Sequence, residues 1–272
     1  MKIPNVRNSL VLRTRQQIRE GCIHSGADPG VGFASIGEML HRIPAPRPWT
    51  SRFAWLHPKV YLAMHIVLGL LLAAGCGWLF YEIADALTGG GRLVAFDEVV
   101  ARWIEAHNTE PGEKIALGIS LLGNQILWPL LTFIGVGYLI RREWPRAALI
   151  IAASGGGALL NLVLKDRFQR ERPIFANEFK VDGTSFPSGH AMAAFIGWGV
   201  IAYLVAAHVH HARARRIVFT SAAVLILLIG LTRVYLDVHF VSDVAAGFLA
   251  GGVWLFVCIS GFRFAHWKHL GE

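Results

Sequence analysis

The sequence predicts an all-α polytopic membrane protein in which six transmembrane helices form a bundle. Hydrophobic residues make up 54% of the 272 residues and charged residues only 16%, which is too apolar for an ordinary soluble domain. Six segments approach the roughly 20 apolar residues that a helix needs to cross a bilayer core of about 30 Å. Polar stretches, several of them strongly basic, separate these segments.

The six expected spans occupy residues 60–80, 116–140, 147–164, 191–207, 217–234 and 244–262. The residues before them, 1–59, are basic, contain several Pro and Gly, and lack the apolar core of a signal peptide. We therefore expect a partly disordered cytoplasmic tail at 1–59, a membrane domain at 60–262 and a short cytoplasmic C-terminus at 263–272.

The distribution of basic residues predicts the orientation in the membrane. The tail, the C-terminal end and the loops at 141–146 and 210–216 together hold 17 of the 26 Lys and Arg. Cytoplasmic loops of membrane proteins carry an excess of these residues, so we expect both termini inside a bacterial inner membrane. This placement also explains the net charge of +8 without a nucleic-acid partner. The outer loop 81–115 contains FDEVVARWIEAH, which is typical of an amphipathic helix lying along the interface.

The stretch KDRFQRERP, residues 165–173, departs from this charge pattern because it places four basic residues in an outer loop. One interpretation is a solvated run that pairs with lipid head groups. The other is an anion site, since Lys and Arg at an apolar boundary are suited to phosphate. FPSGH, residues 186–190, shares this loop, and TRVYLDVHFVSD, residues 232–243, follows two spans later. Two crossings return the chain to the same side, so we expect the three stretches to meet.

His239 and Asp243 are four residues apart, so on a helix they would share one face. A carboxylate that accepts a hydrogen bond from one ring nitrogen fixes the tautomer and leaves the other nitrogen free to attack. Alone, the pair also fits a polar helix start with Asp243 as the cap. The presence of Arg233, His190 and the basic loop favours a catalytic pair.

Three motifs occur in order: K-x6-R-P at Lys165 to Pro173, P-S-G-H at Pro187 to His190, and R-x5-H-x3-D at Arg233, His239 and Asp243. Together they resemble the type 2 phosphatidic acid phosphatase (PAP2) family, and the six-span layout extends the resemblance over 60–262. Two positions differ from the family pattern. Thr232 replaces a Ser and keeps its hydroxyl. Asp237 replaces the Gly of many relatives, which bears on the shape of the loop before His239.

The resemblance implies a role for each motif residue. His239 would attack phosphorus, Asp243 would orient it, and His190 would protonate the leaving oxygen. The phosphate oxygens would be bound by Lys165, Arg172, Ser188, Gly189 and Arg233. These positive charges and donors stabilise a transition state whose negative charge is spread over the phosphoryl oxygens, so no metal or other cofactor is expected.

The sequence thus predicts an integral membrane lipid phosphatase that forms a phosphohistidine at the periplasmic face. Undecaprenyl diphosphate, phosphatidylglycerol phosphate, phosphatidic acid and lipid A phosphates all suit a site at span ends, where the tail stays among the helices. A lipid phosphotransferase would use the same site and pass the phosphoryl group to another lipid. A non-enzymatic lipid transporter or binder would leave the three motifs unexplained.

Overall fold

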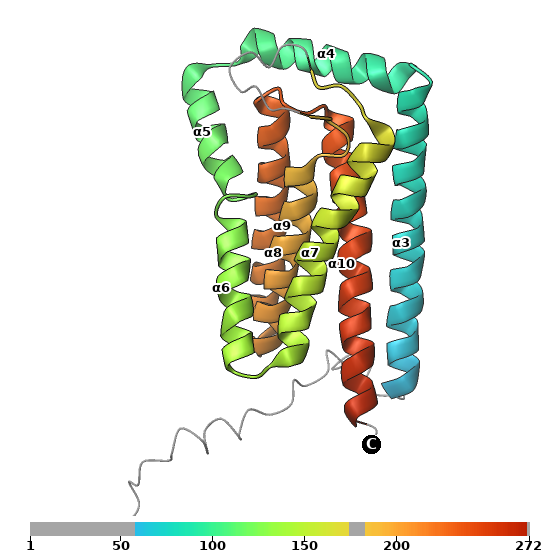
Figure 1. The fold of residues 1–272 in the computed structure, drawn as a ribbon, viewed down its shortest axis with the longest axis vertical. Helices are drawn as coiled ribbons and strands as arrows, with labels where there is room; N and C mark the ends of the chain where they lie inside the picture. Colours follow the sequence, from blue (N-terminus) through green and yellow to red (C-terminus); the bar gives the residue numbers. More distant parts are fainter. Residues whose placement is uncertain (1–57, 174–182, 271–272) are drawn as a thin grey trace, which may run out of the picture. The chain divides into compact units, whose positions relative to one another are not determined.

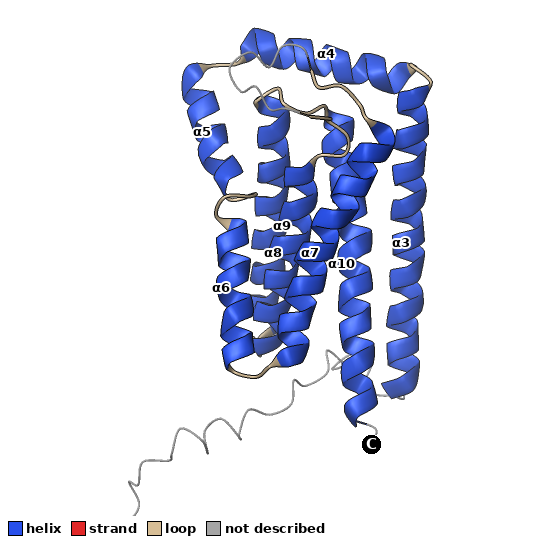
Figure 2. Ribbon diagram, viewed as in Figure 1, coloured by secondary structure: helices blue, strands red, loops and turns tan. Residues whose placement is uncertain are grey.

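The computed structural model describes residues 58–173 and 183–270, which form helices and loops with no strand in these ranges (Figure 2). The helices are α3 (Pro58–Thr88), α4 (Arg92–His107), α5 (Glu110–Leu121), α6 (Leu127–Ile140), α7 (Trp144–Phe168), α8 (Gly189–His208), α9 (Ala212–Tyr235) and α10 (Val241–Leu270). Five of them, α3 and α7 to α10, are long and apolar enough to cross a membrane, and α6 is a shorter apolar helix. The all-α membrane fold is confirmed, whereas the predicted tail at 1–59 falls almost wholly outside the described residues.

Helix α8 packs against α7, α9 and α10 and is the most buried of the five long helices (Figure 1). Its buried side chains Met192, Ile196 and Val200 form the centre of the main apolar cluster. Large apolar side chains elsewhere point outward, among them Phe133 and Leu162, which are 78% and 64% exposed. Such outward apolar surface is expected where lipid rather than water surrounds the bundle.

Helix α4 lies across one end of the bundle, between α3 and α5 (Figure 1). It confirms the helix predicted for FDEVVARWIEAH. Its inner face buries Asp97 and Ala101, while Phe96, Val99 and Trp103 are exposed. The helix therefore presents apolar side chains outward and one aspartate inward.

The second expected span, 116–140, is divided into α5 and α6, which follow one another along the bundle (Figure 1). Residues 122–126 form the turn between them, at Gly123 and Asn124, two residue types that favour turns. Pro129 sits in the first turn of α6, where a missing N–H is tolerated. A Cβ on Gly123 would lie 2.6 Å from Ile229 and 3.5 Å from the His190 ring, so the turn passes close to a predicted site residue.

The three motif-bearing stretches meet at the end of the bundle that α4 covers (Figure 1). The Ser185 N–H donates to the carbonyl of Arg170 at 2.7 Å, and the Ser188 N–H donates to the carbonyl of Asp243 at 2.9 Å. These two hydrogen bonds join the loop after α7, the start of α8 and the start of α10. The expectation that the three stretches meet is confirmed.

Candidate active site

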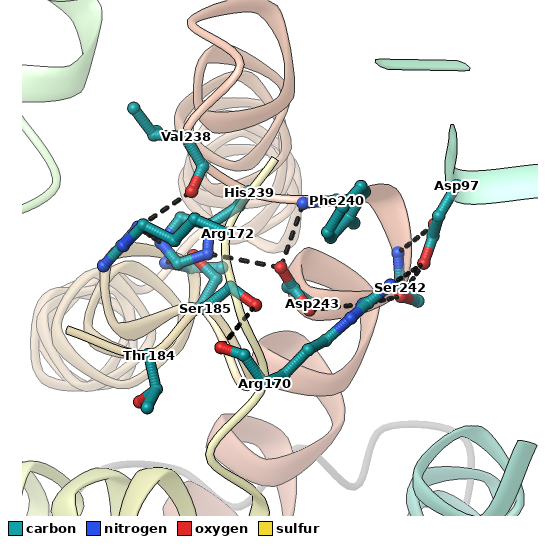
Figure 3. Close-up of polar contacts among 12 residues, drawn as sticks. Asp97, Arg170, Arg172, Thr184, Ser185, Val238, His239, Phe240, Ser242 and Asp243 are labelled. Atoms are coloured by element: carbon teal, nitrogen blue, oxygen red, sulfur yellow. Dashed lines mark hydrogen bonds and ion pairs between the residues drawn. The ribbon is translucent and has the colours of Figure 1, made fainter. Parts of the chain in front are cut away.

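His239 and Asp243 face one another (Figure 3), although His239 lies two residues before α10 and so does not share a helical face with Asp243 as the spacing predicted. Asp243 is fully buried and His239 is 3% exposed. The Phe240 N–H donates to Asp243 Oδ2 at 2.9 Å, so the carboxylate does cap the helix. The same oxygen lies 3.5 Å from His239 Nδ1, which has no hydrogen-bond partner in the described parts of the chain. Asp243 therefore caps α10 and also lies beside the imidazole of His239.

The other ring nitrogen of His239 faces a cation. Arg172 Nη1 lies 3.4 Å from His239 Nε2 and donates to the carbonyl of Val238 at 2.8 Å. Burial lowers the pKa of His239 to about 4, although Asp243 opposes this shift. The imidazole is therefore neutral at neutral pH. With its proton on Nδ1 toward Asp243, the Nε2 lone pair is available for attack.

Lys165 and Arg172 border a cavity of about 400 Å³ at this end of the bundle. Lys165 Nζ donates to the carbonyl of Thr184, and Arg172 Nε donates to the carbonyl of Gly183 at 3.1 Å. Both cations are bound by backbone carbonyls, and neither forms an ion pair with a carboxylate among the described residues. No carboxylate in the described ranges lies within ion-pair distance of either positive charge.

Arg233 is buried, with 6% of its surface exposed, in the last turn of α9. Its Nη1 donates to the hydroxyl of Ser120 on α5 at 2.6 Å. Its Nε has no hydrogen-bond partner, and no carboxylate in residues 58–173 or 183–270 pairs with it. A buried guanidinium with a free donor is suited to an anion.

The PSGH stretch starts α8 as its sequence predicted: the buried Ser188 is the N-cap, and its hydroxyl accepts the Ala191 N–H at 3.5 Å. Gly189 follows, where a Cβ would lie only 3.0 Å from Asn161 Oδ1. His190 is the second residue of α8, and the Ser188 N–H joins the start of this helix to the carbonyl of Asp243. The structure therefore brings all the predicted site residues to one end of the bundle.

A second cavity, of about 290 Å³, runs from His190 into the bundle between α6, α7 and α8. Most of its lining is apolar, including Leu127, Leu131 and Ile196, with Asn124 and Asn161 among its few polar side chains. It provides apolar space beside the predicted proton donor, within the membrane-spanning part of the protein.

The two departures from the family pattern have different consequences. The Thr232 hydroxyl donates to the carbonyl of Ile229 at 2.7 Å, within α9. Asp237 adopts the left-handed φ of 53°, a conformation that Gly adopts without strain. Its Oδ2 is buried without a hydrogen-bond partner in the described structure. Burial, together with the charge of Glu105, raises the pKa of Asp237 to about 6.

Sequence reasoning missed two charged residues at the site, Arg170 and Asp97. Arg170 donates to Asp243 Oδ1 at 2.7 Å and to Asp97 Oδ2 at 2.9 Å. Arg170 lies inside the KDRFQRERP stretch, at a position that the motif leaves open, and Asp97 is an acidic residue within the predicted amphipathic helix. Nothing in the sequence around Arg170 or Asp97 indicates that the two side chains pair.

Comparison with known proteins identifies the family. The model of the PAP2 superfamily matches residues 146–267, which include all three motifs. Phosphatidylglycerophosphatase B of Bacillus subtilis (strain 168) is 35% identical over 187 residues, a match that covers 68% of this chain and 92% of that protein. The chain belongs to the PAP2 superfamily. It is therefore a membrane phosphatase, as its motifs predicted.

Comparison with solved structures gives two matches to this PAP2 protein, one of which shares its fold. One is a transmembrane PAP2 type phosphatidylglycerolphosphate phosphatase from Bacillus subtilis, with a TM-score of 0.65 and 33% identity, covering 71% of this chain and 96% of the other. The other is LpxE of Aquifex aeolicus, with a TM-score of 0.46 and 27% identity, covering 58% of this chain and 92% of that one.

Proposed function

We propose that this PAP2 protein hydrolyses the phosphate monoester of a membrane lipid, with phosphatidylglycerol phosphate as its preferred substrate. The observation that carries the proposal is the set of cations without carboxylate partners beside a buried, neutral His239. The match to phosphatidylglycerophosphatase B over 92% of that protein supports this lipid ahead of undecaprenyl diphosphate, phosphatidic acid and lipid A phosphates.

In the first step, His239 Nε2 attacks phosphorus while Asp243 stabilises the proton on Nδ1. The P–N bond forms as the bond to the lipid oxygen breaks, and His190 gives its proton to that oxygen. Lys165, Arg172 and Arg233 bind the phosphoryl oxygens, with further donors from Ser188 and the Gly189 N–H. They stabilise the negative charge that is spread over these oxygens in the transition state.

In the second step, water attacks the phosphohistidine. His190, now neutral, takes a proton from this water, so that the P–N bond breaks and inorganic phosphate is released. Each proton moved in the first step is thereby returned, and His190 ends the cycle protonated. The three cations provide the charge neutralisation that a metal ion provides in other phosphatases, so the proposed mechanism needs no metal or cofactor.

The two cavities support an amphiphilic substrate. Lys165 and Arg172 border the polar cavity, whereas the apolar cavity runs from His190 into the bundle. A lipid with its head group at the cations can therefore place part of its tail among α6, α7 and α8. The distribution of loop charges supports a position of this end of the bundle at the periplasmic face of a bacterial inner membrane.

The experiment is a phosphate-release assay on the purified full-length protein in detergent, with the four lipids named above. We expect the fastest release from phosphatidylglycerol phosphate, unchanged activity in EDTA, inhibition by vanadate, and an acid-labile phosphoenzyme. His239→Ala should abolish turnover and the phosphoenzyme, whereas His208→Ala, an exposed His at the other end of α8, should behave as the wild type.

Three outcomes would contradict this function. No release from any of the four lipids would exclude a lipid phosphatase. Loss of activity in EDTA that a divalent ion restores would exclude the metal-free mechanism. Transfer of the phosphoryl group to a second lipid, in place of release as inorganic phosphate, would identify a phosphotransferase.

A further inference from the structure

Arg170 connects the catalytic carboxylate to the helix at the membrane interface (Figure 3). Its Nη1 donates to Asp243 Oδ1 at 2.7 Å and to the Ser242 hydroxyl at 2.8 Å, and its Nη2 donates to Asp97 Oδ2 at 2.9 Å. Both carboxylates are fully buried, and the Arg170 side chain is 15% exposed. A single guanidinium therefore holds two buried acids from α4 and α10.

Asp97 is held in turn by the start of α10. Its Oδ1 accepts the Ser242 N–H at 3.1 Å, and its Oδ2 also accepts the Ser242 hydroxyl. The planar guanidinium of Arg170 lies over the ring of Phe240, with Cζ 4.1 Å from the ring centroid. The position of Arg170 is thus fixed from several directions, which is the condition for a side chain that must orient another.

The backbone that carries Arg170 is also fixed. Its carbonyl accepts the Ser185 N–H at 2.7 Å and the Ser185 hydroxyl at 3.3 Å, and the carbonyl of Glu171 accepts the same hydroxyl at 2.8 Å. Ser185 is fully buried. These hydrogen bonds hold the backbone of residues 170 and 171 against Ser185.

Arg170 differs from the three proposed phosphate-binding cations in its partners. Lys165, Arg172 and Arg233 have no carboxylate partner in the described residues, whereas both ends of the Arg170 guanidinium are bonded to carboxylates. Three of its five N–H donors are bonded to Asp97, Asp243 and Ser242. The charge of Arg170 is compensated by two carboxylates and is not available to a substrate. We therefore look for its function in the positions of Asp97 and Asp243.

We propose that Arg170, anchored by Asp97, is a positioning residue that orients Asp243 toward His239 for phosphoryl transfer; this inference rests on the function proposed above. By bonding Oδ1, Arg170 leaves Oδ2 to face the imidazole and the Phe240 N–H. It also supplies the cation that a fully buried carboxylate requires. Because Asp97 lies on α4, the geometry of His239 and Asp243 depends on how α4 packs against the bundle.

The test compares kcat and KM for purified Arg170→Met, Arg170→Lys and Asp97→Asn on phosphatidylglycerol phosphate. Arg170→Met should lower kcat by about 10²-fold, the size of effect that a misplaced catalytic group produces. KM should change little, because the phosphate-binding cations are intact. Arg170→Lys should retain more activity than Arg170→Met, since it keeps the charge but not the fork that bonds both acids. Asp97→Asn should also lower kcat at nearly constant KM.

Two matched controls and a mutant cycle accompany these variants. Arg167→Met removes an exposed cation three residues earlier, and Glu98→Gln removes an exposed carboxylate beside Asp97; both should match the wild type. If Arg170 acts through Asp243, then adding Arg170→Met to Asp243→Asn should lower kcat far less than it does in the wild-type background. Thermal unfolding and gel filtration establish that each variant is folded.

The outcomes separate this inference from the proposed function. If the wild type releases phosphate and Arg170→Met retains its kcat, the inference is wrong and the function stands. The same holds if Arg170→Met raises KM alone, or if its effect is fully additive with that of Asp243→Asn. If Arg170→Met does not fold, a wild-type kcat in both Arg170→Lys and Asp97→Asn overturns the inference. A wild type without phosphatase activity overturns both proposals.

Discussion

Gly247, one turn after Asp243 on α10, sets how closely this helix approaches the start of α8. A Cβ at Gly247 would lie 2.7 Å from the carbonyl oxygen of Ser188, 3.1 Å from Ala191 Cβ and 3.3 Å from the backbone nitrogen of Met192. The first distance is shorter than real contacts allow, and two of the three atoms are backbone. Gly247→Ala must therefore push α10 away from α8, and overpacking of this kind destabilises by about 1–3 kcal/mol.

For a domain of this size, the destabilisation corresponds to a decrease in Tm of roughly 2 to 12 °C. We also expect a lower kcat, because the same displacement moves Asp243 relative to His190. The assay is thermal unfolding in detergent together with phosphate release. The control is Gly252→Ala on the same helix, where a Cβ would meet the Phe195 ring at an ordinary 3.4 Å. Wild-type Tm and kcat in Gly247→Ala would refute the argument that this contact sets the helix spacing.

Three further predictions concern the roles of single residues. His190→Ala should retain a larger fraction of wild-type activity on p-nitrophenyl phosphate than on a lipid monophosphate, because a good leaving group needs less protonation; equal defects on both would contradict the acid assignment. Asp237→Asn should raise Tm most above about pH 6 and progressively less toward about pH 4, because the raised pKa of Asp237 makes its ionisation in the folded state unfavourable in that range; a pH-independent difference would contradict this. In a variant without the native cysteines, Thr184→Cys should react in intact cells with a reagent that cannot cross the inner membrane; labelling only after that membrane is permeabilised would reverse the orientation.

Much of the site could be predicted from the sequence because its residues lie at helix ends in three short stretches. The four-residue spacing keeps His239 beside Asp243, with His239 just before α10 and Asp243 in its first turn. The number of crossings brings the other two stretches to the same end of the bundle. The amphipathic pattern likewise predicted α4, whose apolar and polar positions alternate with the helical period. These features depend on local sequence and on the number of crossings.

The sequence could not reveal the contacts that depend on tertiary packing. Hydropathy alone predicted a single span at 116–140, which the structure divides into α5 and α6. Apolar residues flank the turn at Gly123 on both sides, so the hydropathy averaged along the segment does not show this short break in the helix. The hydrogen bond between Arg170 and Asp97 joins residues 73 positions apart, and it depends on how α4 packs against the end of the bundle. Nothing in either local pattern distinguishes a paired charge from a free one.

The partners of the site cations also explain why the geometry suits a phosphate monoester. Lys165, Arg170, Arg172 and Arg233 bring four positive charges to this end of the bundle, and the buried acids Asp97 and Asp243 bring two negative charges, both bonded to Arg170. The buried His239 is neutral at neutral pH. Among the described residues, Lys165, Arg172 and Arg233 are the site cations that have no carboxylate within ion-pair distance. A phosphate monoester carries about −1.5 to −2 charge at neutral pH and three strong acceptor oxygens, so it offers these cations a counter-charge. A phosphodiester, with a single negative charge, would offer them less. In the sequence the basic residues of KDRFQRERP look equivalent. In the structure Arg170 bonds the carboxylate that we propose orients His239, whereas Lys165 and Arg172 have no carboxylate partner among the described residues and can bind the proposed phosphate.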